Sequence, residues 1–166
     1  MAAALAVPEL VAALLLIVAG LAKLRSPAPA ALAVGVPAWL VQGFAAFELG
    51  LGGVAVVTGG TVPALLMAVM YCGFALLTLR LSREGEACGC FGAPESPASP
   101  LQSVLSIGLA VACGVAALAD AHGLGWVLSR PAGPVLVVCA GTVGSAYGLV
   151  LAYTQLPALW RAWSPA

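Results

Sequence analysis

Charge is scarce in this 166-residue chain: Asp, Glu, Lys and Arg together make up 7% of it, against about 25% in a typical soluble domain. So few charges cannot cover a water-exposed surface, and 63% of the residues are hydrophobic. The six basic and six acidic residues also cancel, which leaves no excess positive charge to attract nucleic acid. We therefore expect an integral membrane protein that does not bind nucleic acid.

Basic residues are missing before Lys23, so the chain lacks the positively charged start of a secretory signal peptide. We interpret the first hydrophobic stretch as a retained membrane helix that begins at Pro8, with Glu9 in its first turn. Histidine is nearly absent as well, and the single one, His122, is assigned no role.

Long polar segments are also missing. Five apolar stretches are long enough to cross the hydrocarbon as helices, and prolines stand at or near their starts. The short connections leave no room for a soluble catalytic module. We therefore predict one domain over residues 1–166, an all-α bundle of five transmembrane helices with short loops, at residues 8–24, 37–57, 62–81, 100–119 and 134–153.

The basic residues predict how the bundle is oriented, because Lys and Arg concentrate in cytoplasmic loops. One basic residue, Arg130, falls on one side of the predicted bundle and the rest fall on the other. We therefore expect the N-terminus outside the cell and the loop between the third and fourth helices in the cytoplasm. The basic residues on the predicted cytoplasmic side are Lys23, Arg25, Arg80, Arg83 and Arg161.

That loop contains Cys88-Gly89-Cys90-Phe91-Gly92, two thiols separated by a glycine. Closing such a pair requires a sharp turn, which glycine allows, and a strained bridge is easily reduced. The alternatives are an inert pair or half of a metal site, although a tetrahedral zinc needs four ligands. At the end of the loop, Ser99 and Gln102 have the spacing of a capping box, which predicts a rigid start to the fourth helix.

Three further cysteines lie in predicted helices. Cys72, Cys113 and Cys139 step from the middle of the membrane toward the outer face in the predicted orientation. They could form a thiol relay from the cytoplasmic loop. Buried cysteine more often packs as a small hydrophobic residue, which is the alternative.

Glu48 falls near the centre of the second helix, where a charge is expensive and usually faces the interior of the bundle. Its candidate partners are Lys23, Arg25 and Gln42. The pairing could fix helix packing alone, or Glu48 could contact a quinone or a transferred proton.

Gly144 and Gly148, with Gly141 and Ser145, give the last helix a face of small residues. Such spacing is typical of close helix contact. We favour packing within the monomer, and a homodimer interface is the alternative.

Three signatures together resemble the MauE family of methylamine-utilisation membrane proteins, which is related to the DoxX-like group. The similarity spans most of the first 120 residues, and the signatures stand at the end of the first helix, in the second helix and after the third. Their sequences are Gly20-Leu-Ala-Lys23-Leu-Arg-Ser-Pro27, Glu48-Leu-Gly50-Leu-Gly52 and Cys88-Gly-Cys90-Phe91-Gly92.

The resemblance implies a small polytopic protein that works with a thioredoxin-like partner of the MauD type. In the namesake system the two support maturation of the disulfide-rich small subunit of methylamine dehydrogenase. By analogy, Cys88 and Cys90 would be the exchanging pair, acting as a thiol-disulfide oxidoreductase. The competing hypotheses are a non-enzymatic membrane assembly factor and a small quinone-binding or transport subunit centred on Glu48. No cofactor is required for the first reading, and a quinone is the candidate for the last.

Overall fold

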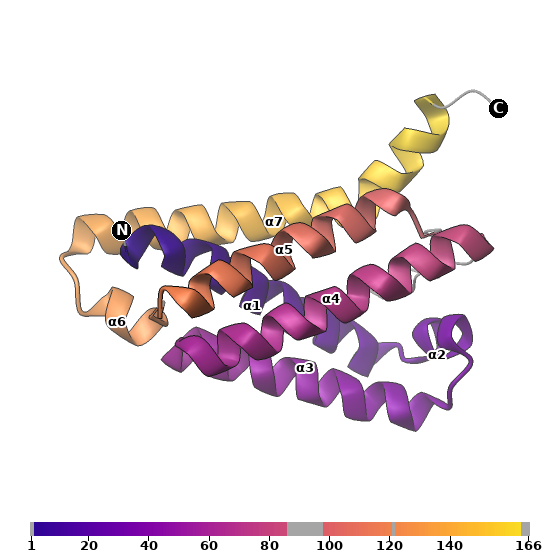
Figure 1. The fold of residues 1–166 in the computed structure, drawn as a ribbon, viewed down its shortest axis with the longest axis horizontal. Coiled ribbons are helices and arrows are strands. Elements are labelled where there is room, and N and C mark those ends of the chain that lie inside the picture. The colour runs from indigo at the N-terminus through magenta and orange to yellow at the C-terminus, as the bar shows by residue number, and fades with distance from the viewer. Residues whose placement is uncertain (1, 86–97, 121, 164–166) are drawn as a thin grey trace.

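The computed structural model describes residues 2–85, 98–120 and 122–163, and their regular structure is helical apart from an isolated bridge. Seven helices follow one another within these described residues and lie mostly along one direction (Figure 1). They are α1 (Ala2–Arg25), α2 (Ala28–Val34), α3 (Ala38–Thr58), α4 (Thr61–Glu84), α5 (Pro100–Leu118), α6 (Leu124–Leu128) and α7 (Ala132–Trp163).

Five of these helices are long and apolar enough to cross a membrane, which confirms the predicted all-α membrane fold. The first and last residues of each predicted span lie within three positions of those of an observed span. The agreement is close because the length of the apolar run decides where a span can lie. The observed spans are Ala6–Arg25, Ala38–Thr58, Thr61–Glu84, Pro100–Leu118 and Ala132–Gln155.

Two local predictions were wrong. Helix α1 begins at Ala2, so Pro8 lies inside it and does not start it. The preceding alanines and Leu5 are among the strongest helix formers, and they extend the helix across the proline. The connections that were expected to be loops also contain the short helices α2 and α6.

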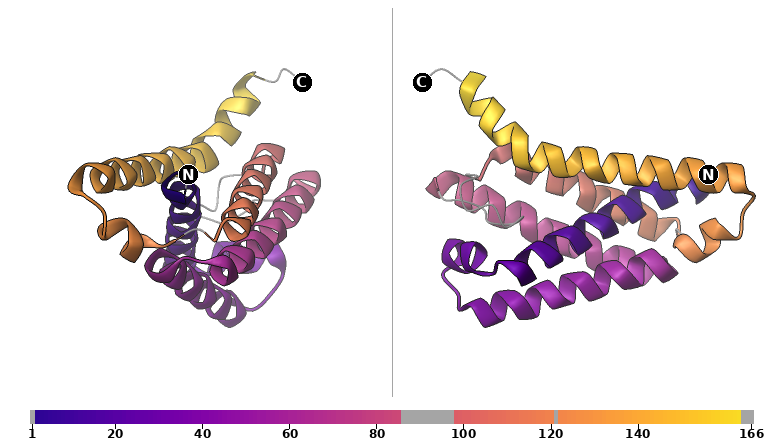
Figure 2. Two further views of the ribbon diagram at one scale, coloured as in Figure 1. Left: turned by 60° about the vertical axis from the view of Figure 1, so that its left-hand side comes forward. Right: turned by 180° about the vertical axis from the view of Figure 1, so that it is seen from behind.

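Helix α1 lies at the centre of the bundle, between α7 on one side and α3 to α5 on the other (Figure 2). About 56% of its membrane span is buried, against 11% of the α7 span. The core that surrounds it draws residues from all five spans, including Leu16, Leu51, Met67, Cys113 and Tyr153. Helix α7 is therefore a peripheral element of the monomer.

Two glycines allow α1 and α3 to touch through their backbones. A Cβ built at Gly20 would lie 2.8 Å from the carbonyl oxygen of Ala45, and one at Gly52 would lie 2.8 Å from that of Ala13. Helices in membranes approach closely where small residues meet, since packing rather than hydrophobic burial holds them together. The α1–α3 contact thus depends on these positions.

One end of the bundle is fastened by contacts between two connections. Gly59, with φ of 61°, forms a bridge with His122, and a Cβ at Gly59 would meet the Gly123 nitrogen at 2.1 Å. Beside this turn, the Thr61 hydroxyl donates to the carbonyl oxygen of Ala117 at 3.1 Å. The α3–α4 turn is therefore held against the segment that follows α5.

The opposite end contains the C-terminus of α1, helix α2 and the ends of α4 and α5 that flank residues 86–97 (Figure 1). The predicted capping box is confirmed there: the Ser99 hydroxyl accepts from Leu101 N and the Ser99 N–H donates to Gln102 Oε1 at 3.1 Å. Gln102 also donates to the carbonyl oxygen of Tyr153 at 2.9 Å, which ties α5 to α7.

The glycines of the small-residue face of α7 do not pack against the part of the chain that the structure describes. A Cβ built at Gly141, Gly144 or Gly148 would have nothing among the described residues within 4 Å. The favoured sequence interpretation of this face was therefore wrong, because α7 turns its glycines away from the other helices. The homodimer alternative stays a prediction.

Replacing Gly52 by alanine tests the backbone contact between α1 and α3. We expect Gly52→Ala to lower the free energy of unfolding by about 1–3 kcal/mol, because its Cβ would be pressed against the Ala13 carbonyl. The matched control is Gly50→Ala on the same helix, where nothing lies within 4 Å and stability should hold or rise slightly. Thermal unfolding in detergent measures both, and equal effects would contradict this packing.

Candidate functional site

Cys88 and Cys90 lie outside the described residues, which include the helix ends before and after them. Helix α4 is capped at its C-terminus by Gly85, which has φ of 73° and donates its N–H to the carbonyl oxygen of Leu81. Helix α5 starts at the Ser99 capping box. Behind these ends, the hydroxyls of Thr78 and Ser103 share a buried hydrogen bond of 2.7 Å that joins the two helices.

Lys23 and Glu48 form a buried ion pair between α1 and α3, with the Lys23 Nζ donating to Glu48 Oε1. Glu48 is fully buried and Lys23 is 6% exposed. Of the three partners considered from the sequence, the structure selects Lys23, while Arg25 and Gln42 are exposed. Pairing makes the carboxylate tolerable inside a membrane, where a lone charge is expensive.

The amine of Lys23 also faces two aromatic rings. It lies 5.5 Å from the ring centroid of Phe44 on α3 and 4.9 Å from that of Phe74 on α4. The two rings meet edge to face, with centroids 6.2 Å apart. Aromatic faces attract a cation, so these rings stabilise the ammonium in an apolar setting.

Glu48 keeps an unused acceptor. Its Oε2 is buried and has no hydrogen-bond partner among the described residues. An ammonium has three N–H donors, of which Glu48 takes one here. The pair can therefore accept a further hydrogen bond or proton at Glu48 and donate one from Lys23.

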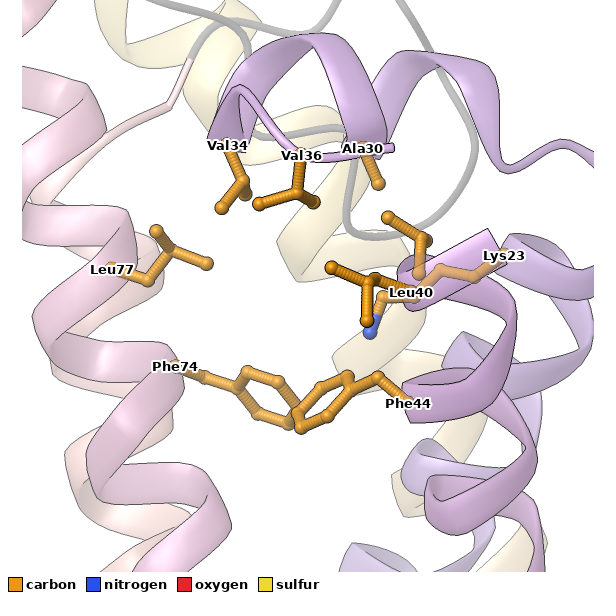
Figure 3. A pocket seen from close by; sticks show the side chains of 9 residues that line it. Lys23, Ala30, Val34, Val36, Leu40, Phe44, Phe74 and Leu77 are labelled. Atoms are coloured by element: carbon orange, nitrogen blue, oxygen red, sulfur yellow. The ribbon is translucent and has the colours of Figure 1, made fainter. Parts of the chain in front are cut away.

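A cavity of about 340 Å³ lies beside this pair, between the end of α1, the short helix α2, and helices α3 and α4 (Figure 3). Among the described residues that line it, Lys23 is the polar one, and its amine reaches into the space between Leu40 and the two phenylalanines. The others are Ala30, Val34, Val36, Leu40, Val41, Phe44, Phe74 and Leu77. Sequence reasoning did not find this cavity, because α2 was expected to be a loop.

The three helix cysteines occupy different surroundings. Cys72 is exposed on α4, Cys113 is fully buried in the core, and Cys139 on α7 is partly buried and lines a second cavity of about 150 Å³. All three are free thiols. Their role in a relay stays a prediction.

Glu9 is a candidate residue that sequence reasoning missed. It is 1% exposed on α1, and neither carboxyl oxygen has a hydrogen-bond partner among the described residues. The available signal was an acidic residue inside an apolar stretch, which indicates function by default. Placing the helix start at Pro8 hid that signal, since acids are ordinary in a first turn.

Further buried hydrogen bonds connect the spans, and no sequence pattern predicts them. The Tyr71 hydroxyl donates to the carbonyl oxygen of Ala12 at 2.6 Å, joining α4 to α1. The hydroxyls of Ser106 and Tyr153 lie 2.8 Å apart and join α5 to α7. These bonds satisfy polar groups that would otherwise face hydrocarbon, and they fix the relative positions of the helices.

The family model described as methylamine utilisation protein MauE matches residues 1–120. No curated protein and no solved structure matches this chain. The matched range contains the Lys23–Glu48 pair, the cavity and both cysteines of the C-x-C motif.

A double-mutant cycle tests the buried pair. We expect Lys23→Met to lower the free energy of unfolding by about 3–5 kcal/mol, because it leaves Glu48 charged and unpaired in the interior. Adding Glu48→Leu should restore most of this loss, since an apolar pair of similar volume needs no counter-charge. Unfolding in detergent checks both, and equal losses in the single and double variants would show that the pair does not couple.

Proposed function

Because the chain belongs to the MauE family of methylamine utilisation proteins, we propose that it is a membrane component of thiol-disulfide exchange. It exchanges electrons with a thioredoxin-like partner of the MauD type. Through that partner it supports the maturation of client proteins that contain disulfides or cofactors, as in the namesake system for methylamine dehydrogenase. Cys88 and Cys90 are the reacting pair.

The observation that carries this proposal is the anchoring of both ends of the C-x-C connection. Gly85 caps α4, the Ser99–Gln102 box starts α5, and the Thr78–Ser103 bond joins the two helices behind them. A thiol pair used for exchange has to be presented at a defined place while its own backbone keeps the freedom to close and open. Fixed helix ends around a Cys-Gly-Cys motif supply that combination.

The reaction transfers two electrons. One thiolate of the pair attacks a sulfur of the partner's disulfide, so that a mixed disulfide forms and the partner's other sulfur leaves as a thiolate. The second cysteine then attacks the mixed disulfide, closes the Cys88–Cys90 bridge and releases the partner with both sulfurs reduced. The same steps run in reverse when the partner is the reductant.

A second candidate function is a non-enzymatic assembly factor that holds a partner or a second copy in the membrane. The exposed small-residue face of α7, at Gly144 and Gly148, favours this candidate, because no described residue covers it. In that case the cysteines would be dispensable, and bulky substitutions on this face would abolish function.

Serine substitution of the two cysteines separates these candidates. We expect the Cys88→Ser, Cys90→Ser double variant to lose disulfide exchange with a purified thioredoxin-like domain to the background rate. One of the single variants should accumulate a mixed disulfide, visible on a non-reducing gel, because the resolving thiol is gone. Cys72→Ser is the control, since that thiol lies on the exposed face of α4. Full exchange by the double variant would sink the proposal.

Thiol labelling tests the proposed orientation, in which the C-x-C connection is cytoplasmic. The variant for this experiment has Cys72, Cys113 and Cys139 replaced by alanine, so that Cys88 and Cys90 are its remaining thiols. We expect a membrane-impermeant maleimide to label inverted vesicles and not intact cells, as the distribution of Lys and Arg predicts. Labelling of intact cells alone would reverse the orientation.

A further inference from the structure

We propose that the cavity beside Lys23 binds the headgroup of a membrane quinone, which accepts the electrons of the Cys88–Cys90 dithiol. This inference rests on the proposed function, since it names the molecule that reoxidises the pair. It is carried by the size, lining and position of the cavity and by the free donors of Lys23.

The size and lining of the cavity fit a single substituted ring. At about 340 Å³ it lies at the lower end of the range of small-molecule sites, which are mostly apolar with a few polar groups that fix orientation. The rings of Phe44 and Phe74 offer aromatic surface at one end, and aliphatic side chains form the rest. A flat ring packs against such a wall by stacking or edge contact.

The position of the cavity fits a ligand that arrives from the bilayer. Val34, Leu40 and Phe44 line it and are 46%, 44% and 44% exposed, so its rim faces the surroundings of the bundle. In a membrane those surroundings are hydrocarbon. A long isoprenoid tail can therefore remain in the lipid while the ring enters between α2, α3 and α4.

The polar group of the cavity distinguishes a quinone from a lipid chain. Lys23 has N–H donors beyond the one that Glu48 takes, and a quinone carbonyl oxygen is an acceptor for them. A hydrocarbon tail has no such acceptor and would leave the donors without a partner. An anion from water is disfavoured, because the rest of the lining is apolar and Glu48 already balances the charge.

The cavity is also close to the end of α4, which the C-x-C motif follows in the sequence. Leu77 lines it and lies eight positions before Gly85, which is about 12 Å of helix. The electron count closes without another reactant: two S–H bonds break, one S–S bond forms, and the two electrons and two protons convert both quinone carbonyls to hydroxyls. A quinone is therefore a sufficient oxidant for the pair.

Filling the cavity tests this inference. The probe is a benzoquinone with a decyl tail, used in a photoreactive form to measure labelling of the full-length protein in nanodiscs. We expect Leu77→Trp to reduce labelling at least tenfold, because the indole occupies the ring's space. Leu76→Trp is the matched control, since that neighbour is 70% exposed and lines no part of the cavity, and it should label normally.

A second pair of variants on α2 guards against misfolding of the α4 variant. Val34→Trp enters the cavity from the other side and should also reduce labelling, whereas Leu32→Trp, at a position 83% exposed, should not. In the wild type, excess decylbenzene should fail to displace the probe, because it lacks carbonyl oxygens. Equal labelling of the filled and control variants, or displacement by decylbenzene, would overturn the inference.

Disulfide exchange with the thioredoxin-like domain is measured on the same variants. If the inference holds, Leu77→Trp exchanges thiols at the wild-type rate but no longer passes electrons to the quinone. Equal labelling of the filled and control variants, together with normal disulfide exchange, would overturn the quinone site alone. Exchange that persists without Cys88 and Cys90 would instead remove the redox function itself.

Discussion

The ion pair of Lys23 and Glu48 is the interaction on which the arrangement around the cavity depends. A carboxylate inside a membrane needs a counter-charge, and here that requirement fixes α3 against the last turns of α1. The backbone contacts at Gly20 and Gly52 bring the two helices close enough for the pair to form. The same pairing holds the Lys23 amine over Phe44 and Phe74, and it therefore determines where the polar group of the cavity lies.

Much of the fold could be predicted from the sequence, because a small number of physical rules determines it. The length of each apolar run fixed the spans to within three residues, and the Ser99–Gln102 spacing located the start of α5. Glu48 could be identified as an interior residue with Lys23 among its partners, since an intramembrane charge needs one. Within the described part of the chain, the helices differ from the predicted ones in number because the short helices α2 and α6 form within the connections.

The remaining features depend on three-dimensional packing, which no local pattern in a single sequence predicts. Glu9 was taken for a helix-start residue because Pro8 precedes it, although α1 extends across the proline. Small-residue spacing in α7 indicates a contact but not which partner makes it, and none of the described residues covers that face. The cavity could not be predicted without knowing that α2 folds beside Lys23 and forms part of the cavity wall. The redox role of Cys88 and Cys90 remains a prediction of the sequence and the family.

The fastening of the bundle at Gly59 and His122 makes its two ends mechanically unequal. Helices α3, α4 and α5 are held together there, so a tilt of one against another pivots about that end. Because displacement grows with distance from a pivot, a 10° tilt of a helix about 30 Å long moves its far end by about 5 Å. That far end contains Phe44, Leu77 and the C-terminal end of α4. The Thr78–Ser103 bond keeps α4 and α5 together near that end, so a small rigid tilt of α3 against them would widen the cavity while the opposite end of the bundle stayed closed.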